Sequence, residues 1–532
     1  MHARPNILII LADDMGFSDI GCFGSEIHTP NLDALAADGL RMTAFTNAAR
    51  CCPSRASLLT GYYPHQVGIG GMTRPCALDA YQGYLRADRP TTAELLQAAG
   101  YHTWCSGKWH VGGDYAVHQR QQWQDAGDAT HPLPTQRGFT RYYGTLGGAG
   151  SYFQPPTLLD QEHFIDDFPE DYHLTDALSQ RACDFIDEAA AAEKPFYGYL
   201  AYTAPHWPLH AWEEDIAAYR GCYREGWDVL RQRRFAALRA AGLLDHSWDL
   251  SPRDEDSHPW DSTAHPQWEA ERMAVYAAMV SHMDRGIGQV MQRLKDQGLY
   301  DDTLIIFMSD NGGCAEFLRE DGEAGRWPEF YNLPTNRGTL CTVGNNPHRQ
   351  PGPAETFMSY DLPWANASNT PFRKFKVWTH EGGISTPFVA RWKNGGINGN
   401  RLSHAFAHIN DLAATIHAAS GVAHPGDHGD LPPLPGRDLL PLWRGQRASI
   451  WDDSPVFWEH EDHAAVRHGR WKLVRARADE AWQLHDMQRD RTELHDLAAE
   501  HPAVVNSLAS AWQDWADQVG VRPRAEVVAH FT

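Results

Sequence analysis

The chain has 532 residues, of which 68 are acidic and 46 are basic, so its formal net charge is −22. This balance argues against general binding to nucleic acid or to an anionic membrane surface, and any anionic substrate must be held by a local cluster of cations. No run of about 18 apolar residues occurs, which excludes a membrane-spanning helix. The length suits one large domain with a smaller one appended.

The cysteines and the first residues bear on the compartment. Nine cysteines, an odd number spread between Cys22 and Cys341, form no spaced disulfide framework and favour a reducing compartment. The sequence leads from Met1 into an apolar run without the regions of a signal peptide. We therefore expect a cytoplasmic protein.

Strands and helices alternate through most of the chain. Residues 6–12 form a continuous apolar, β-branched run, typical of a strand buried on both faces of a largely parallel sheet. Further strands are predicted at residues 102–106, 195–202, 303–308 and 387–392. Helices are predicted at residues 29–39, 92–100 and 273–294. This alternation implies a layered α/β domain.

Residues 51–61 read Cys-Cys-Pro-Ser-Arg-Ala-Ser-Leu-Leu-Thr-Gly and run into an apolar segment of helical character. A structural cysteine pair at a helix start would account for Cys52, because buried cysteines behave as small hydrophobic residues. It gives no reason for the Pro-Ser-Arg that follows. The stretch resembles the signature at which sulfatases convert a cysteine, here Cys51, into formylglycine.

Two long segments interrupt the alternation. Residues 207–272 are rich in Trp, Arg, Asp and Pro, with helical pieces at 211–220 and 227–241. Residues 312–369 carry an excess of Gly, Pro and Asn. Loops of this length inside a compact domain are usually functional.

A stretch rich in Pro, Gly and Asp, residues 421–435, indicates a boundary after a helix that begins near Asn410. Beyond it, the patterns predict a hairpin, a strand and a terminal helix, at residues 464–475, 482–485 and 501–519. We expect a catalytic domain over residues 1–435 and a small α+β subdomain with an antiparallel sheet over residues 436–532.

Polar residues follow the carboxyl ends of four predicted strands. They are Asp13 and Asp14, Lys108 and His110, His206, and Asp310 with Asn311. In open α/β sheets ligands bind beyond the carboxyl ends of the strands, so these groups can converge on one crevice. An Asp-Asp pair alone is more often a solvated turn or a helix cap, but the separate Asp310–Asn311 pair favours a shared site.

These motifs resemble type I, formylglycine-dependent sulfatases of the alkaline phosphatase-like superfamily over nearly the whole chain. The matching motifs lie at residues 10–14, 51–61, 107–110, 204–206, 309–312 and 376–383. Residues 364–373 are similar to bacterial arylsulfatases in particular. The resemblance implies an alkaline phosphatase-like layered α/β/α domain with a large mixed, mostly parallel sheet.

The same resemblance implies a metal site. Calcium would be held by Asp13, Asp14, Asp310, Asn311 and the modified Cys51, with Mg²⁺ or Mn²⁺ as alternatives. Calcium prefers about six to eight oxygen ligands, which leaves places for a substrate oxygen. The expected cations that admit an anionic substrate are Arg55, Lys108 and Lys376.

By the same resemblance, Cys51 becomes formylglycine (3-oxoalanine), and its hydrate attacks sulfur. His206, with Lys376 beside it, would protonate the leaving group. His110 would take the second proton of the hydrate, and Asp310 is the candidate base for the attack. The substrate pocket is expected to be shaped by Tyr152, Phe153 and Trp207.

The expected activity is hydrolysis of sulfate esters, with a small aryl sulfate or a sulfated sugar as substrate and a formylglycine-generating maturase as partner. A phosphomonoester, phosphodiester or phosphonate hydrolase on the same fold is one alternative. Another is a non-catalytic binder of sulfated ligands that keeps Cys51 as a thiol. No sequence pattern sets the oligomeric state.

Overall fold

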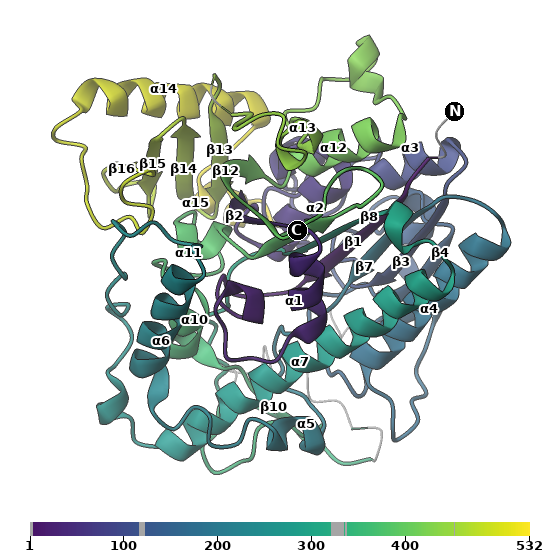
Figure 1. Ribbon diagram of the computed structural model, residues 1–532, viewed down its shortest axis with the longest axis horizontal. Coiled ribbons are helices and arrows are strands. Elements are labelled where there is room, and N and C mark those ends of the chain that lie inside the picture. Colours follow the sequence, from purple (N-terminus) through teal and green to yellow (C-terminus); the bar gives the residue numbers. More distant parts are fainter. Residues whose placement is uncertain (1–3, 116–122, 321–334, 336–337, 452, 532) are drawn as a thin grey trace.

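The computed structural model describes residues 4–115, 123–320, 335, 338–451 and 453–531 (Figure 1). A ten-stranded sheet forms its centre, in the order β12-β2-β11-β8-β1-β7-β3-β4-β5-β6. The central strands are β8 (Thr303–Ser309), β1 (Asn6–Ala12), β7 (Phe196–Ala201) and β3 (His102–Gly107). The flanking strands are β12 (Arg401–His408), β2 (Leu40–Thr46), β11 (Phe388–Arg391), β4 (Arg141–Thr145), β5 (Leu158–Asp160) and β6 (His163–Phe164).

The burial of strand β1 explains why the sheet lies between two hydrophobic cores. It pairs in parallel with both β7 and β8, and every one of its side chains is buried. Because successive side chains of a strand point to opposite faces, Leu8 and Ile10 join one hydrophobic core while Ile7 and Ile9 join the other. Helices must therefore cover both faces of the sheet.

Two sets of helices pack on the two faces of the sheet. One core includes residues from α1 (Pro30–Ala37), α4 (Leu174–Ala191) and α7 (Pro266–Asp296), and Figure 1 shows α4 and α7 side by side. The other core includes residues from α2 (Cys51–Thr60), α3 (Thr92–Ala98) and α12 (Asp411–Ser420). The predicted layered α/β/α domain with a mixed, mostly parallel sheet is confirmed.

A separate antiparallel sheet lies toward the end of the chain. Its strands run in the order β13 (Val456–His460), β14 (His463–His468), β15 (Trp471–Arg475) and β16 (Gln483–Asp486). Helix α14 (Pro502–Val519) packs Leu508, Trp512 and Trp515 against this sheet. The predicted antiparallel sheet is confirmed, and a domain boundary at residue 435 stays a prediction.

The two long segments contain more regular structure than the sequence predicts. The first includes α5 (Glu213–Ala217) and α6 (Gly226–Ala240), close to the predicted helical pieces. The second includes β9 (Thr342–Val343), β10 (Thr356–Phe357) and α10 (Asp361–Ser368); residues 321–334 of this segment lie outside the described residues. Within the described part of the chain, no helix is both long and apolar enough to cross a bilayer.

Candidate active site

The polar residues that follow the four central strands lie close together at the carboxyl ends of these strands. Lys108, just after β3, places Nζ 2.5 Å from Oδ2 of Asp13, just after β1. Asn311, just after β8, donates from Nδ2 to Oδ1 of Asp14 over 2.6 Å. His206, beyond the end of β7, lies with Nε2 3.3 Å from Oδ2 of Asp14. The structure thus brings together groups that are up to 298 positions apart in the sequence (Asp13 to Asn311).

The backbone at the end of β1 is held in an unusual conformation. Asp14 has φ of 65°, in the left-handed region that costs a non-glycine residue about 1–3 kcal/mol. Its N–H donates to Oδ1 of Asp310 over 3.2 Å, and the next N–H, of Met15, donates to Oγ of Ser309 over 2.9 Å. These contacts from β8 fix the direction in which the two Asp carboxylates point.

Arg55 forms ion pairs with the carboxylates of Asp13 and Asp310. Its guanidinium lies 2.7 Å from Oδ2 of Asp310 and 3.4 Å from Oδ2 of Asp13, and it is completely buried. The same group donates to the carbonyl of Lys108 over 3.0 Å. Arg55 stands four residues after Cys51 in α2, a spacing that puts both on one face of the helix. One fully buried cation thus links α2, β1, β3 and β8.

Cys51 is the first residue of α2, and its thiol occupies the position where the resemblance places the aldehyde. Ligand atoms of Cys51, Cys52 and His110 all lie within 4.8 Å of one another. A hydrogen bond with Cys52, together with the charge of Lys108 and a hydrogen bond with His110, lowers the pKa of Cys51 well below its usual value although burial opposes this. Burial lowers the pKa of His110 to about 4, so this ring is neutral.

The carboxylates carry the pattern expected of a cation site. Oδ1 of Asp13 and Oδ1 of Asn311 are buried and have no hydrogen-bond partner in the part of the chain that the structure describes, which is costly for oxygen atoms unless a further ligand satisfies them. Burial, and next the charge of Asp13, raises the pKa of Asp310 well above its usual value. A hard divalent cation prefers such oxygen donors and offsets their charge. Asp13, Asp14, Asp310 and Asn311 therefore fit calcium or a similar ion.

The ammonium of Lys376 lies beside both Asp14 and His206. Nζ of Lys376 lies 2.9 Å from Oδ2 of Asp14 and 3.3 Å from Nε2 of His206. Nδ1 of His206 donates to the carbonyl of Trp207 over 2.6 Å, so Nε2 is the nitrogen that faces the site. Burial lowers the pKa of His206. Burial also opposes the charged form of Lys376, but the charges of Asp14, Glu316 and other nearby groups together outweigh it and raise the pKa of Lys376 well above its usual value.

The three predicted pocket aromatics differ in their surroundings. Tyr152 is buried and donates from its hydroxyl to the carbonyl of His206 over 2.9 Å. Phe153 is also buried, and its ring packs against the rings of His210 and Trp212. The ring of Trp207 lies 4.6 Å from that of His206. Tyr152 therefore supports the backbone of His206, and substrate contact by these residues stays a prediction.

Glu316 is a residue that the sequence analysis missed. Its carboxylate accepts from Nε1 of Trp207 over 2.8 Å and lies 3.1 Å from the guanidinium of Arg50, next to Cys51. Part of its side chain stays exposed, so it lies at the border between the site and solvent. The sequence indicated only that residues 312–369 as a whole are functional, and it did not single out Glu316. Tyr199 and Ser309, which contact Arg55 and Met15, were missed as well.

Two protein-family models together match nearly the whole chain. The model described as Sulfatase matches residues 5–422. The model described as N-sulphoglucosamine sulphohydrolase, C-terminal, matches residues 372–516, which include the four-stranded sheet.

Several relatives are similar along most of their length. An uncharacterized sulfatase of Schizosaccharomyces pombe is 32% identical and aligns with 97% of this chain and 94% of its own. An arylsulfatase of Klebsiella aerogenes is 32% identical over 79% of this chain and 87% of its own. Human N-acetylgalactosamine-6-sulfatase is 28% identical over 86% of this chain and 69% of its own.

Solved structures agree in fold. Ps i-CgsB in complex with k-i-k-neocarrahexaose superposes with a TM-score of 0.66 at 26% identity, covering 96% of this chain and 93% of that chain. The phosphonate monoester hydrolase of Agrobacterium radiobacter superposes with a TM-score of 0.56 at 21% identity, covering 97% and 96%, a likeness that concerns the fold alone. The chain belongs to the sulfatase family and is a sulfuric ester hydrolase with the alkaline phosphatase-like fold.

Proposed function

We propose that this sulfatase acts through a formylglycine formed from Cys51, assisted by a calcium ion at Asp13, Asp14, Asp310 and Asn311, with Mg²⁺ or Mn²⁺ as alternatives. One observation carries the proposal. Cys51 begins a buried helix beside Lys108 and His110, next to carboxylate and amide oxygens that have no partner. A structural cysteine needs none of these neighbours.

The two added groups supply what the side chains lack. The hydrated aldehyde provides a nucleophile for sulfur and a route for releasing sulfate, and the cation lowers the negative charge on the sulfuryl group. The chain's own residues do the rest. Lys108 and Arg55 hold positive charge beside residue 51, and the N-terminus of α2 adds a partial positive charge where the sulfate ester would lie.

Four residues are proposed to transfer protons. Neutral His110, beside residue 51, is placed to accept a proton from it. His206 and Lys376 meet at Asp14 and can deliver a proton to the oxygen of the departing alcohol or phenol. Asp310 is the candidate base for the attack on sulfur.

For the substrate, we expect aryl sulfates to be accepted and a small sulfated sugar to be the natural ligand. The names of relatives support both classes, since they include an arylsulfatase and an N-acetylgalactosamine-6-sulfatase. Matched p-nitrophenyl sulfate, p-nitrophenyl phosphate and a phosphonate monoester separate this activity from the phosphorus-based alternatives. A large preference for a phosphorus ester would overturn the sulfatase assignment.

The modification is tested by mass spectrometry of the peptide that contains Cys51, from protein made with a formylglycine-generating maturase. Conversion replaces one sulfur and two hydrogens by one oxygen, so the peptide mass falls. Cys51→Ala abolishes turnover, and Cys52→Ala is the matched control that keeps both the conversion and the activity. An unmodified peptide from an active enzyme contradicts the proposal, and an unmodified peptide from an inactive protein favours the non-catalytic binder.

A cytoplasmic location is part of the same proposal. All nine cysteines are free, seven of them in or against the main cores, which suits a reducing compartment. Fractionation of the native host with periplasmic and cytoplasmic marker enzymes tests this, and recovery with the periplasmic marker would contradict it.

A further inference from the structure

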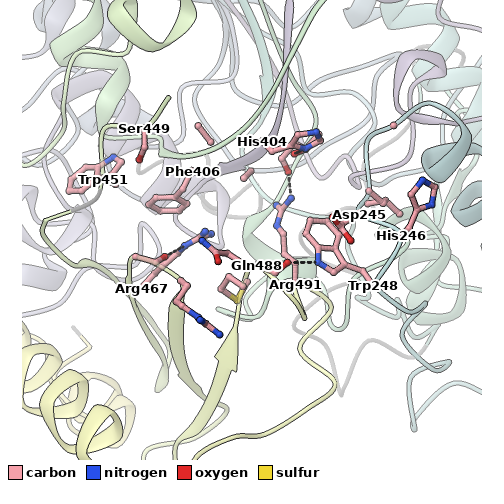
Figure 2. Close-up of a pocket in the computed structure, with 18 residues that line it drawn as sticks. Asp245, His246, Trp248, His404, Phe406, Ser449, Trp451, Arg467, Gln488 and Arg491 are labelled. Carbon is pink, nitrogen blue, oxygen red and sulfur yellow. Dashed lines mark hydrogen bonds between the residues drawn. The ribbon is translucent and has the colours of Figure 1, made fainter. Parts of the chain in front are cut away.

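A pocket of about 620 Å³ lies between the small antiparallel sheet and the edge of the large one. Its walls come from β2, β12, the segments that follow α6 and precede β13, and the ends of β14 and β16 (Figure 2). We call it the Arg467 pocket, and its labelled side chains are Asp245, His246, Trp248, His404, Phe406, Ser449, Trp451, Arg467, Gln488 and Arg491. The volume lies in the usual range for small-molecule sites. None of the proposed catalytic or metal-binding residues lines it.

Among the described residues, no acidic side chain forms an ion pair with Arg467. Nη1 is buried without a hydrogen-bond partner, and its guanidinium stacks 4.3 Å from the centre of the Phe406 ring. Burial lowers its pKa to about 10, and the acid that most opposes this, Glu381, is already paired with Lys472 and Arg491. A partly buried, unpaired charge costs free energy that a bound anion would recover.

The other charges of the pocket are balanced. Arg470 and Arg491 also line it, but Arg470 pairs with Asp486 and Arg491 with Glu381, and among the described residues Asp245 is the one acidic side chain in its wall. Asp245 accepts from Oγ and N–H of Ser247 and is exposed. Arg467 is therefore the arginine of this wall that can bind an anion.

Three aromatic rings also line the pocket. Trp248 and Trp451 both use their indole N–H inside the protein, on the carbonyl of Gln488 and the carboxylate of Asp411. Their rings and that of Phe406 therefore offer apolar surface to a ligand instead of hydrogen bonds. Figure 2 shows the Arg467 guanidinium reaching toward the middle of the pocket beside the Phe406 ring.

We propose that the Arg467 pocket is a second, non-catalytic binding site for an oxyanion carried on a ring, the chemistry of a sulfated sugar unit. Arg467 would bind the oxyanion, and Phe406, Trp248 and Trp451 would contact the ring. The choice of a sulfated sugar rests on the proposed function. The preference for an oxyanion rests on the geometry around Arg467 alone.

The test is calorimetric titration of Cys51→Ala protein with N-acetylgalactosamine 6-sulfate. We expect two sites, of which Arg467→Met weakens one by about tenfold or more, because a charge-assisted hydrogen bond is lost. Lys108→Ala should weaken the other site and leave the Arg467 pocket unchanged. Arg477→Met is the matched control, since Arg477 lies in the same subdomain with a side chain 74% exposed. Equal binding by the Arg467→Met and Arg477→Met proteins overturns the proposal.

Two further measurements separate the parts of the claim. Unsulfated N-acetylgalactosamine should bind the pocket more weakly than the sulfated sugar, by about tenfold or more. An equal affinity for inorganic sulfate and for the sulfated sugar overturns the role of the aromatic wall.

Without ligand, Arg467→Met should keep or raise Tm, because an unpaired charge is removed. A clear loss of Tm would show a structural role instead. If the enzyme hydrolyses no sulfate ester, the proposed function fails while inorganic sulfate still tests the Arg467 site.

Discussion

Nζ of Lys376 lies 3.3 Å from Nε2 of His206, and both atoms contact the same oxygen of Asp14, at 2.9 and 3.3 Å. The carbonyl of Trp207 holds the opposite nitrogen of the His206 ring. Two groups that can carry a proton therefore lie next to each other beside Asp14. A substrate oxygen bound next to this pair could contact both groups, which is the arrangement that protonation of a leaving group needs.

Lys376→Ala and His206→Ala should each affect poor leaving groups most. For alkyl or sugar sulfates we expect a loss in kcat/KM of about 10²–10⁴-fold, the usual contribution of general acid catalysis. For p-nitrophenyl sulfate the loss should be much smaller, because a good leaving group needs little protonation. The measurement is a plot of log kcat/KM against the pKa of the leaving phenol, which should become steeper in both variants.

Lys374→Ala is the control for that series. Lys374 stands two residues from Lys376, but its ammonium pairs with Asp254 at 3.1 Å, away from the carboxylates of the site. Its removal should leave the slope of the plot unchanged. Equal losses on good and poor leaving groups in Lys376→Ala and His206→Ala would refute the acid role of the pair.

The metal site leads to a prediction about stability as well as activity. Dialysis against EDTA should lower both activity and Tm, and calcium should restore them. An ion that binds only the folded state at 100 times its Kd adds about 2.7 kcal/mol to the free energy of unfolding. Asp13→Asn should hold less metal by elemental analysis, whereas Asp479→Asn, an exposed carboxylate far from the site in sequence, should hold as much as wild type. Unchanged metal content in Asp13→Asn would contradict the assigned ligands.

The strands that carry the site could be predicted because burial on both faces leaves a continuous apolar run. The predicted strand at residues 6–12 matches β1, and that at 303–308 ends one residue before β8 does. Strand β2 was missed because Arg41, Thr43 and Thr46 interrupt its apolar residues. Thr43 and Thr46 are nevertheless buried, through hydrogen bonds to β12 that no local pattern reveals.

Helix α4 was missed although the sequence carries its signal. Leu174, Leu178, Ala182 and Ile186 recur every four residues and are all buried, which is the pattern of an amphipathic helix. Glu316 is a different case. Its partner Arg50 lies 266 positions away, and the segment that holds Glu316 has no periodic pattern that would indicate the contact. Residues at strand ends can thus be predicted together, whereas residues on long loops cannot.

Arg55 should be essential for stability because it is a buried cation between two carboxylates. Removal of one partner from a buried ion pair leaves an uncompensated charge and typically costs about 3–5 kcal/mol. We expect Arg55→Ala to lower the free energy of unfolding by about this amount in urea titrations. Arg86→Ala, which breaks a partly exposed pair with Asp88, should cost about 0–1 kcal/mol. Similar costs for the two variants would contradict the burial of the Arg55 pair.

His210 ties the backbone near the site through both of its ring nitrogens. Nε2 donates to the carbonyl of Thr356 over 2.6 Å, and Nδ1 accepts from the N–H of Tyr152 over 3.3 Å. The ring is fully buried and must be neutral to make both bonds. Burial lowers its pKa from 6.5 to about 4.

This shift predicts that acidification destabilises the fold. As pH falls below about 6.5 the unfolded chain binds a proton at His210, while the folded protein does not until pH reaches about 4. The stabilising contribution is therefore complete above pH 6.5 and is lost toward pH 4, a change of about 3 kcal/mol. Urea titrations across this range should show a shallower pH dependence for His210→Gln than for wild type. His468→Gln, at the exposed end of β14, should keep the wild-type dependence, and an unchanged slope in His210→Gln would show that other groups cause the acid sensitivity.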